Sequence, residues 1–302
     1  MPDDTGFAAA EPLFERVAII GIGLIGSSMA RAMRHWGLAR EIVIADTSEE
    51  ARETAERLGL GDRVLADASE AARNADLVVV ATPIGAFAQV GRRLGPALET
   101  GAILTDVGSC KMSVIRDLGP FVPDRVHFVP GHPIAGTEHS GPEAGFAELF
   151  EGRWCILTPP PGTDPDAVER VAALWRHCGS NIEVMEPEVH DRVLAITSHL
   201  PHLIAFTIVG TATDLGDWME QEVIKFAASG FRDFTRIAAS DPIMWRDIFL
   251  NNKDALLDVS GRLQEDIARL QRAIRWGEGE EIESLIRRTR EIRRRLIEAK
   301  QA

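Results

Sequence analysis

The sequence predicts an α/β fold, a doubly wound parallel sheet, followed by an all-α helical domain. Three observations lead to this prediction. A glycine-rich turn joins a strand pattern to a helix pattern near the start of the chain, short apolar runs then alternate with helical patterns, and after residue 186 only long helical patterns remain. We expect a disordered tail at residues 1–13, the doubly wound domain at 14–186 and the helical domain at 187–302.

The first predicted strand, residues 17–20, runs into three glycines with the spacing GxGxxG, and a helix pattern follows. In such a turn the first glycine permits a tight bend, the second lets the backbone approach a pyrophosphate, and the third lets the helix pack on the strand. The amide groups at the helix start face the phosphates. The turn therefore predicts a Rossmann-like dinucleotide site formed by Gly21, Gly23, Leu24, Ile25 and Gly26.

Asp46 closes the second predicted strand, residues 42–45, at the distance from the glycines that dinucleotide sites require. A carboxylate here would accept hydrogen bonds from the adenosine ribose hydroxyls and repel a 2′-phosphate. We therefore expect NAD as the cofactor in preference to NADP. The alternative is an ordinary strand–helix turn in which Asp46 only caps the helix that follows it.

Further strands and helices continue the alternation. The run at 76–81 is apolar throughout, as expected for a strand that is buried on both faces of a parallel sheet. Thr82 and Pro83 end it at the edge where such sheets bind ligands, so we expect both to border the cofactor, although a simple turn would look the same. The other predicted strands are 64–65, 102–105, 126–129, 154–158 and 182–186, and the predicted helices are 48–59, 69–75, 86–94 and 166–177.

Four long helices are predicted in the second domain, at 188–213, 218–229, 242–276 and 280–300. On the third, apolar side chains recur at steps of three and four and form one stripe. We interpret this stripe as a helical dimer interface rather than as packing within its own domain. Its members are Leu256, Val259, Leu263, Ile267, Leu270 and Ile274.

The composition limits the possible function classes. With 302 residues, of which 45% are hydrophobic and 26% charged, the chain suits two soluble domains. The net charge of -13 argues against nucleic acid or an anionic membrane as a general partner. The apolar segment 200–212 is too short to span a bilayer, and the acidic start does not resemble a signal peptide.

Cysteine and tyrosine usage adds two further limits. The three cysteines have no CxxC spacing, which indicates a reducing cytoplasm and no metal site. The chain contains no tyrosine, so it cannot use the Tyr and Lys pair of short-chain dehydrogenases.

His132 is the best candidate for a catalytic base. Histidine exchanges protons near neutral pH, and oxidation of an alcohol by hydride transfer requires a base for the hydroxyl proton. His132 follows the strand 126–129 at its carboxyl end, and Gly131, Pro133 and Gly136 indicate a shaped loop around it. Other candidates lie in the motifs DVGSCK, SHLPH and SGFRDFTRIAASDPIMWRD.

Five motifs together resemble the prephenate dehydrogenase family, which includes arogenate and cyclohexadienyl dehydrogenases. They are GIGLIG, DVGSCK, GHPIAGTEHSG, SHLPH and GFRDFTRIAASDPIMWRDIF, and they keep the family's order over most of the chain. The resemblance implies NAD-dependent oxidation of the ring hydroxyl carbon of prephenate or arogenate, with loss of carbon dioxide, in tyrosine biosynthesis. It also implies a cytoplasmic homodimer that forms through the helical domain.

The resemblance assigns roles to residues of this chain. His132 would take the hydroxyl proton, Ser109 would hold the hydroxyl, and Arg236 would bind a substrate carboxylate through its two-pronged guanidinium. Further residues would complete the pocket wall, some of them from the neighbouring subunit. These are His202, Glu138, Arg232, Asp233 and Trp245.

Other polar residues near these motifs receive a structural interpretation. We interpret His199 as satisfying helix contacts only, and Arg246 with Asp247 as a surface ion pair. His139 matches no catalytic position.

Two alternatives remain. A β-hydroxyacid dehydrogenase would need a catalytic lysine in a helix of the second domain, where Lys225 and Lys253 lie in no motif connected with that chemistry. A non-catalytic NAD-sensing protein would have no reason to keep His132, Ser109 and Arg236 together. The sequence does not decide between prephenate and arogenate. The chain has no room for a fused mutase or regulatory domain, so inhibition by tyrosine would act at the active site.

Overall fold

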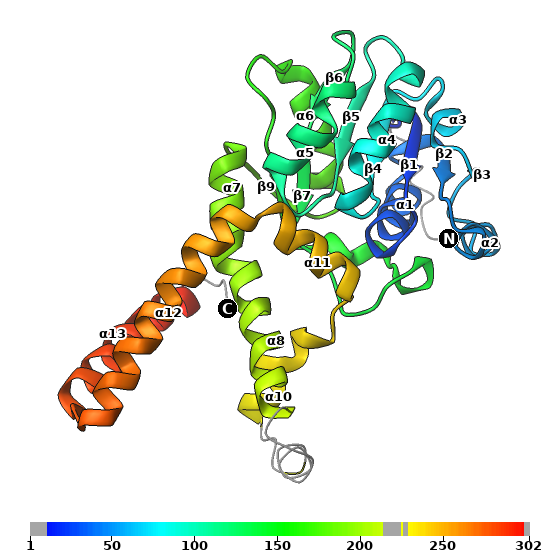
Figure 1. Ribbon diagram of the computed structural model, residues 1–302. Helices are drawn as coiled ribbons and strands as arrows, with labels where there is room; N and C mark the ends of the chain where they lie inside the picture. Colours follow the sequence, from blue (N-terminus) through cyan, green and yellow to red (C-terminus); the bar gives the residue numbers. More distant parts are fainter. Residues whose placement is uncertain (1–10, 214–224, 226–228, 299–302) are drawn as a thin grey trace, which may run out of the picture. The chain divides into compact units, whose positions relative to one another are not determined.

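The computed structural model describes residues 11–213, 225 and 229–298. The chain forms two compact units, Met1–Lys253 and Asp254–Ala302. The first holds a parallel sheet, a small second sheet and a helical part (Figure 1). The second consists of two helices.

A six-stranded sheet forms the centre of the first unit. All its neighbouring strands pair in parallel, in the order β3-β2-β1-β4-β5-β6. The order reverses between β1 and β4, and open α/β sheets bind ligands at such a point. This arrangement confirms the doubly wound prediction. The strands are β1 Phe14–Ile20, β2 Ala39–Ala45, β3 Arg63–Leu65, β4 Leu77–Val80, β5 Ile103–Asp106 and β6 His127–Val129.

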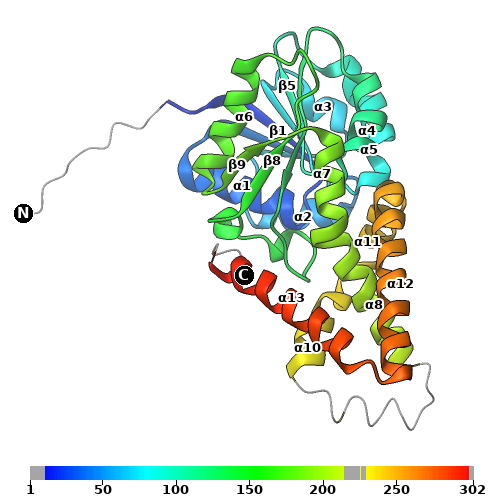
Figure 2. The same ribbon diagram turned by 90° about the vertical axis from the view of Figure 1, so that its left-hand side faces the viewer.

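Helices cover both faces of this sheet. Figure 2 shows α1 and α6 on one face and α4 and α5 on the other. Each layer encloses its own apolar core, and β4 contributes to both because all four of its side chains are buried. The helices are α1 Leu24–Trp36, α2 Glu49–Arg57, α3 Ala68–Ala72, α4 Phe87–Leu94, α5 Lys111–Asp117 and α6 Pro165–His177.

A separate three-stranded sheet contains β7 Gly131–Pro133, β8 Trp154–Leu157 and β9 Asn181–Val184. The predicted strands 154–158 and 182–186 are confirmed. The prediction of a loop at His132 is wrong, because His132 pairs with Ile156 in an antiparallel ladder. The ladder also includes Gly131 and Pro133, so the backbone is fixed before and after His132.

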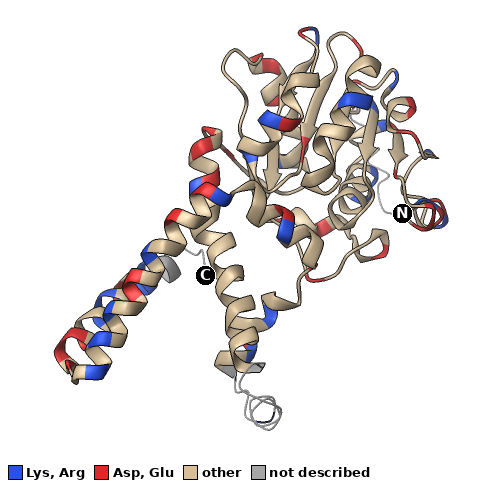
Figure 3. Ribbon diagram, viewed as in Figure 1, with Lys and Arg blue, Asp and Glu red and all other residues tan. Residues whose placement is uncertain are grey.

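One long helix connects the sheets to the helical part. It consists of α7 Pro187–Leu194, a π-helical turn at Ala195–His199, and α8 Leu200–Thr213. This confirms the predicted helix 188–213. The expectation that the apolar segment is too short for a bilayer is wrong, because the segment continues α7: Pro187–Ala212 is long and apolar enough by length and composition. α8 contains no Lys, Arg, Asp or Glu and is therefore tan throughout in Figure 3. A helix without a polar face is typically covered by protein or by lipid.

The remaining helices of the first unit are α10 Ser229–Thr235 and α11 Pro242–Asn251. Most of the predicted helix 218–229 lies outside the described residues. The prediction of one helix over 242–276 is wrong: α11 ends at Asn251, Asn252 leaves helical geometry with φ −115° and ψ 33°, and α12 then begins. Asn252 turns its side chain into the interior, where it is hydrogen-bonded.

The second unit is made of α12 Lys253–Trp276 and α13 Gly279–Glu298, which are joined through Gly277 in the left-handed conformation (φ 69°). Arg269 and Arg272 of α12 form ion pairs with glutamates of the second helix and of the turn. Of the predicted stripe, Leu256 is buried and Val259, Leu263 and Leu270 are half-buried, whereas Ile267 and Ile274 are 47% and 63% exposed. Ile267 and Ile274 are therefore the stripe residues most available to a partner.

Candidate active site

One cavity of about 1250 Å³ extends along the carboxyl edge of the parallel sheet. All of its lining residues belong to the first unit. The glycine turn lies at one part of it, and β7, α8 and α11 border another. This volume exceeds the range of about 300–1,000 Å³ that suits a single small ligand. A dinucleotide and a small substrate could therefore share it.

The glycine turn has the geometry that the sequence predicts. Gly21 has a φ of +99°, and a Cβ on it would lie 2.7 Å from the carbonyl carbon of Ala81. A Cβ on Gly26 would lie 2.1 Å from the carbonyl oxygen of Gly21, whereas a Cβ on Gly23 would meet nothing within 4 Å. Packing therefore requires two of the glycines, and the third leaves open cavity where a pyrophosphate would bind.

Asp46 lies beside this turn and lines the cavity together with Leu24 and Ile25. Its carboxylate accepts hydrogen bonds from the amides of Ile22 and Ser48, both at 2.9 Å. Ser48, rather than Asp46, caps α2. The two amide bonds orient a carboxylate whose oxygens can still accept hydrogen bonds from ribose hydroxyls.

Thr82 and Pro83 follow β4 and also line the cavity. The buried hydroxyl of Thr82 has no hydrogen-bond partner among the described residues. Buried polar atoms are normally paired. An unpaired hydroxyl next to the glycine turn fits a contact with a bound cofactor.

A chain of hydrogen bonds leads from His132 into the protein. His132 Nδ1 lies 2.8 Å from His190 Nε2, and His190 Nδ1 lies 2.8 Å from Asp191 Oδ1. The backbone amides of Lys111 and Met112 donate to the same carboxylate and keep it in place.

This chain determines which nitrogen of each ring carries the proton. The Asp191 carboxylate only accepts, so the proton of neutral His190 is on Nδ1 and its Nε2 accepts from His132 Nδ1. The free electron pair of His132 is then on Nε2, since the hydrogen bond that the ring makes to the described residues uses Nδ1. Since His132 lines the cavity, this atom can accept a proton from a molecule bound there.

The surroundings of His132 also keep it uncharged. Burial is the main cause of a pKa for His132 that lies well below its usual range, and repulsion from His190 and Lys111 lowers it further. Burial likewise lowers the pKa of His190, although Asp191 opposes this shift. Both rings are therefore neutral at neutral pH, as a proton acceptor requires.

A buried ion pair supports this arrangement from behind. Lys111 Nζ lies 2.6 Å from Asp106 Oδ2, and both side chains are fully buried. Lys111 also donates to the carbonyl of Gly131, and Asp106 accepts from the amide of Gly131 at 3.2 Å. The pair thus joins the end of β5 to the residue before His132. Ser109 lies in the loop between the two partners and lines the cavity.

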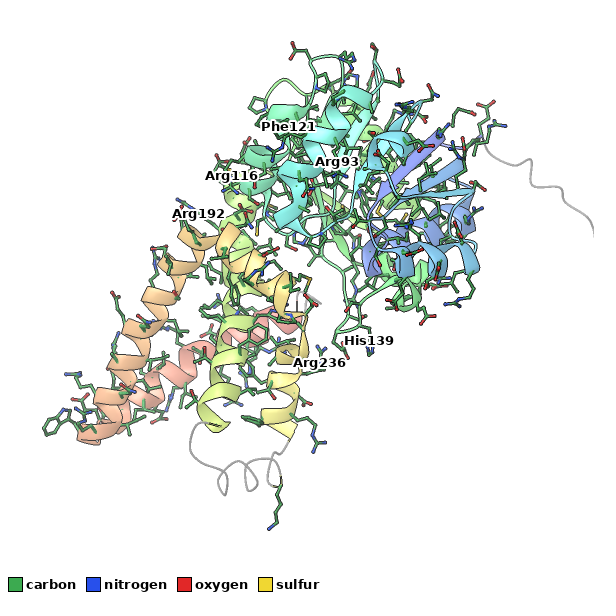
Figure 4. All side chains as sticks on the ribbon, turned by 45° about the vertical axis from the view of Figure 1, so that its right-hand side comes forward. Arg93, Arg116, Phe121, His139, Arg192 and Arg236 are labelled. Atoms are coloured by element: carbon green, nitrogen blue, oxygen red, sulfur yellow. The ribbon has the colours of Figure 1, made fainter. Side chains whose placement is uncertain are left out.

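The opposite part of the cavity has an aromatic and cationic lining. The ring of His202 stacks on Trp245, with ring centroids 3.6 Å apart, and Trp245 Nε1 has no partner among the described residues. Arg236 Nη1 lies 3.5 Å from Glu138 Oε2. Figure 4 labels Arg236 and His139, both of which line the cavity.

The structure brings most predicted site residues into one cavity but not all. Arg232 and Asp233 lie on α10 with exposed side chains and do not line it within one protomer. Lining by the neighbouring subunit stays a prediction for these two. The predicted catalytic and substrate-binding residues that do line the cavity are Ser109, His132, Glu138, His202, Arg236 and Trp245.

Sequence reasoning missed several functional residues. His190 and Asp191 stand in a helix pattern with no motif, and only the adjacent His-Asp pair could have drawn attention to them. His199 is 1% exposed, lines the cavity and bonds Asn252, so helix contacts alone do not describe it.

Arg246 and Asp247 form the predicted ion pair, with Nη2 and Oδ1 2.7 Å apart, but its acidic member does not lie at the surface. Asp247 is buried and packs over Gly85, where a Cβ would lie 2.6 Å from its Oδ2. All three cysteines are buried and free. Among the described residues, no group of three potential ligands could hold a metal ion.

Comparisons with known proteins point to the same family for the sheet-containing part of the chain and for the helical part. The prephenate dehydrogenase nucleotide-binding domain matches residues 29–184, and the prephenate dehydrogenase dimerization domain matches residues 186–288. Cyclohexadienyl dehydrogenase of Zymomonas mobilis is 42% identical over 268 residues, which cover 89% of this chain and 91% of that protein.

Two solved structures are similar over nearly the whole chain. Prephenate dehydrogenase from A. aeolicus, in complex with hydroxyphenyl propionate and NAD+, has a TM-score of 0.86 at 35% identity and covers 93% of this chain and 98% of its own. Synechocystis arogenate dehydrogenase has a TM-score of 0.78 at 26% identity, with 93% and 99% covered. The chain therefore belongs to the prephenate dehydrogenase family.

Proposed function

We propose that the protein is an NAD-dependent dehydrogenase that oxidises prephenate, arogenate or both, with loss of carbon dioxide, in tyrosine biosynthesis. The observation that carries this proposal is the free Nε2 electron pair of His132 in a cavity that begins at a dinucleotide-binding turn. The names of the similar proteins span all three substrate preferences: cyclohexadienyl, prephenate and arogenate.

Each of the cavity residues named below has its own role in this reaction. NAD, when bound, supplies the hydride acceptor. His132 Nε2 takes the proton of the ring hydroxyl, and the His190–Asp191 pair stabilises the positive charge that His132 then carries. Ser109 holds the hydroxyl, and Arg236 binds a substrate carboxylate. When the carboxylate leaves, its bonding electrons complete the aromatic ring, and the ring oxygen takes the proton back from His132.

Asp46 supports NAD rather than NADP. Its carboxylate lines the cavity and would lie near a 2′-phosphate, which it would repel. Equal use of the two cofactors would show that this carboxylate does not face the ribose.

We propose a homodimer as the working form, with a location in the cytoplasm. The dimerization-domain match includes the apolar helix α8. Ile196 in the π-helical turn before it, and Ile243 and Leu250 on α11, expose more than half of their surface. A second copy of the chain, rather than a bilayer, would cover these side chains. Light scattering should give a dimer without detergent, whereas a monomer or a detergent requirement would contradict the proposal.

The direct test is NAD reduction, followed by absorbance, with prephenate and arogenate measured side by side. We expect turnover with at least one of them, and the ratio of the two kcat/KM values gives the preference. Cofactor binding without turnover of either would favour the alternative of a non-catalytic NAD-sensing protein.

A further inference from the structure

The base chain of His132, His190 and Asp191 crosses from the nucleotide-binding match to the dimerization match. His132 lies on β7 in the first, whereas His190 and Asp191 lie on α7 in the second. The two histidine rings meet through one hydrogen bond of 2.8 Å. Proton transfer depends on the orientation of the accepting ring, so β7 and α7 have to keep a fixed distance.

Lys111 contacts both ends of this chain. Its backbone amide, the first of α5, donates to Asp191 Oδ1 at 2.7 Å. Its side-chain ammonium group donates to the carbonyl of Gly131, the residue directly before His132. With the hydrogen bonds of the base chain, these two contacts close a ring that begins and ends at Lys111.

Asp106 fixes the ammonium group of Lys111 in this ring. Its Oδ2 lies 2.6 Å from Lys111 Nζ, and its carboxylate also accepts from the amides of Gly108 and Gly131. Asp106 and Lys111 are fully buried, and neither lines the cavity. The pair therefore acts on a molecule in the cavity only through the residues that it holds.

Stability alone is a weak reason for a buried ion pair. The free energy lost when two charges leave water often exceeds their attraction, so uncharged residues of similar volume stabilise a fold as well or better. What the ammonium group adds here is a charge-assisted hydrogen bond to Gly131 from the same residue whose amide holds Asp191.

We propose that Lys111 is a positioning residue for the base: it keeps β7 and α7 in register, so that the Nε2 acceptor of His132 has one orientation in the cavity. This inference rests on the proposed function. Lys111 itself contacts neither substrate nor cofactor, and it acts through His132.

The test removes the pair without leaving one buried charge unpaired. In Asp106→Asn/Lys111→Met the bond from the ammonium group to Gly131 is lost, while the backbone amide of residue 111 can still donate to Asp191. We expect kcat to fall about 10- to 100-fold, because a displacement of about 1 Å at a reacting group has an effect of this size. The Kd of NAD should stay unchanged, since the glycine turn is not altered.

A matched control removes another ion pair. Arg16 and Glu41 join β1 to β2 with side chains that are 17% and 35% exposed, and neither lines the cavity. Arg16→Met/Glu41→Gln should keep the wild-type kcat. An equal fall of kcat in both pair variants would show that any lost ion pair reduces turnover, and would overturn the role of Lys111.

A double-mutant cycle separates positioning of the base from a general structural role. In His132→Asn there is no base left to position, so adding the Asp106→Asn/Lys111→Met replacement should cause no further fall of kcat. In His177→Asn, which changes an exposed histidine on α6, the same replacement should lower kcat as much as in the wild type. Equal losses in all these backgrounds would overturn the proposal.

The remaining outcomes also decide. An unchanged kcat would remove Lys111 from the reaction, and a loss of NAD affinity as large as the loss of kcat would assign the pair to the cofactor site. Either result overturns the role of Lys111 alone, whereas absence of NAD reduction by the wild-type protein would overturn the proposed function and this role with it. If the variant does not fold, Asp106→Asn/Lys111→Gln, whose glutamine ends short of the Nζ position, replaces it with the same expectations.

Discussion

His132 lines the cavity, and its hydrogen bond to His190, which is bonded to Asp191, leaves its Nε2 unprotonated. Asparagine at this position keeps a polar side chain but cannot accept the hydroxyl proton. We expect kcat of His132→Asn to fall by about 10²- to 10⁴-fold, the usual contribution of a positioned base, with little change in KM. Steady-state kinetics beside His177→Asn would check this, and near-normal turnover would remove His132 from the mechanism.

Asp191 controls the proton positions of the base chain. An asparagine here has one acceptor oxygen instead of two and no negative charge, so it cannot keep both backbone amide bonds and also stabilise a charge on the histidine pair. We expect kcat of Asp191→Asn to fall by about 10²- to 10⁴-fold with NAD affinity unchanged. Asp164→Asn is a matched control, because the Asp164 carboxylate also accepts from a backbone amide at the start of a helix but does not line the cavity. Similar turnover of the two variants would contradict the role of Asp191.

Arg236 should act mainly on substrate binding. Its side chain is 63% exposed and its ion pair with Glu138 contributes little to folding. For Arg236→Ala we expect KM to rise far more than kcat falls, and the melting temperature to stay constant. Arg176→Ala removes a comparable exposed pair on α6 and should behave as wild type. A variant that loses turnover at unchanged KM would place Arg236 in the chemical step instead.

Motifs identified the residues that face the substrate, but not those that control them. Ser109, His132 and Arg236 stand in short segments whose residue types suit the chemistry. His190 and Asn252 contribute through tertiary contacts, 58 residues from His132 in one case and 53 residues from His199 in the other. No local pattern distinguishes such a buried polar side chain from an ordinary helix residue.

Within the glycine turn, Gly26 is needed for packing and Gly23 for cofactor binding. Gly26→Ala should lower the melting temperature, because its Cβ would lie 2.1 Å from a backbone oxygen and overpacking typically costs about 1–3 kcal/mol. Gly23→Ala should melt like wild type yet bind NAD at least about tenfold more weakly, since its methyl group enters the cavity where a backbone approach is needed. Calorimetry and NAD titration would measure both, and equal behaviour of the two alanines would contradict this division.

Helix and strand patterns predicted the doubly wound sheet well, because each strand is an apolar run between clear turns. The patterns failed at β7, at the π-helical turn and at Asn252. A three-residue strand such as Gly131–Pro133 carries no periodicity, and its pairing with β8 is decided by tertiary contact. The break at Asn252 is stabilised by two side-chain hydrogen bonds that a helix pattern does not contain. These irregular places position His132 and His199.

For the whole molecule, the buried histidines make stability depend on pH. Burial is the largest cause of a lowered pKa for each of His132, His190, His199 and His202. In the unfolded chain the same side chains titrate near pH 6.5, so below that pH the unfolded state binds more protons than the folded one. The free energy of unfolding therefore decreases as the pH falls through this range.

We expect the melting temperature to fall by several degrees between pH 7.5 and pH 5, above the range in which most carboxylates titrate. His199→Gln removes one of the four groups, so its melting temperature should depend less steeply on pH than that of the wild type. His177→Gln, an exposed histidine, should keep the wild-type slope. A melting temperature that rises toward pH 5 would mean that the folded protein takes up these protons more readily than the unfolded chain, and the neutral base at His132 could not then be maintained.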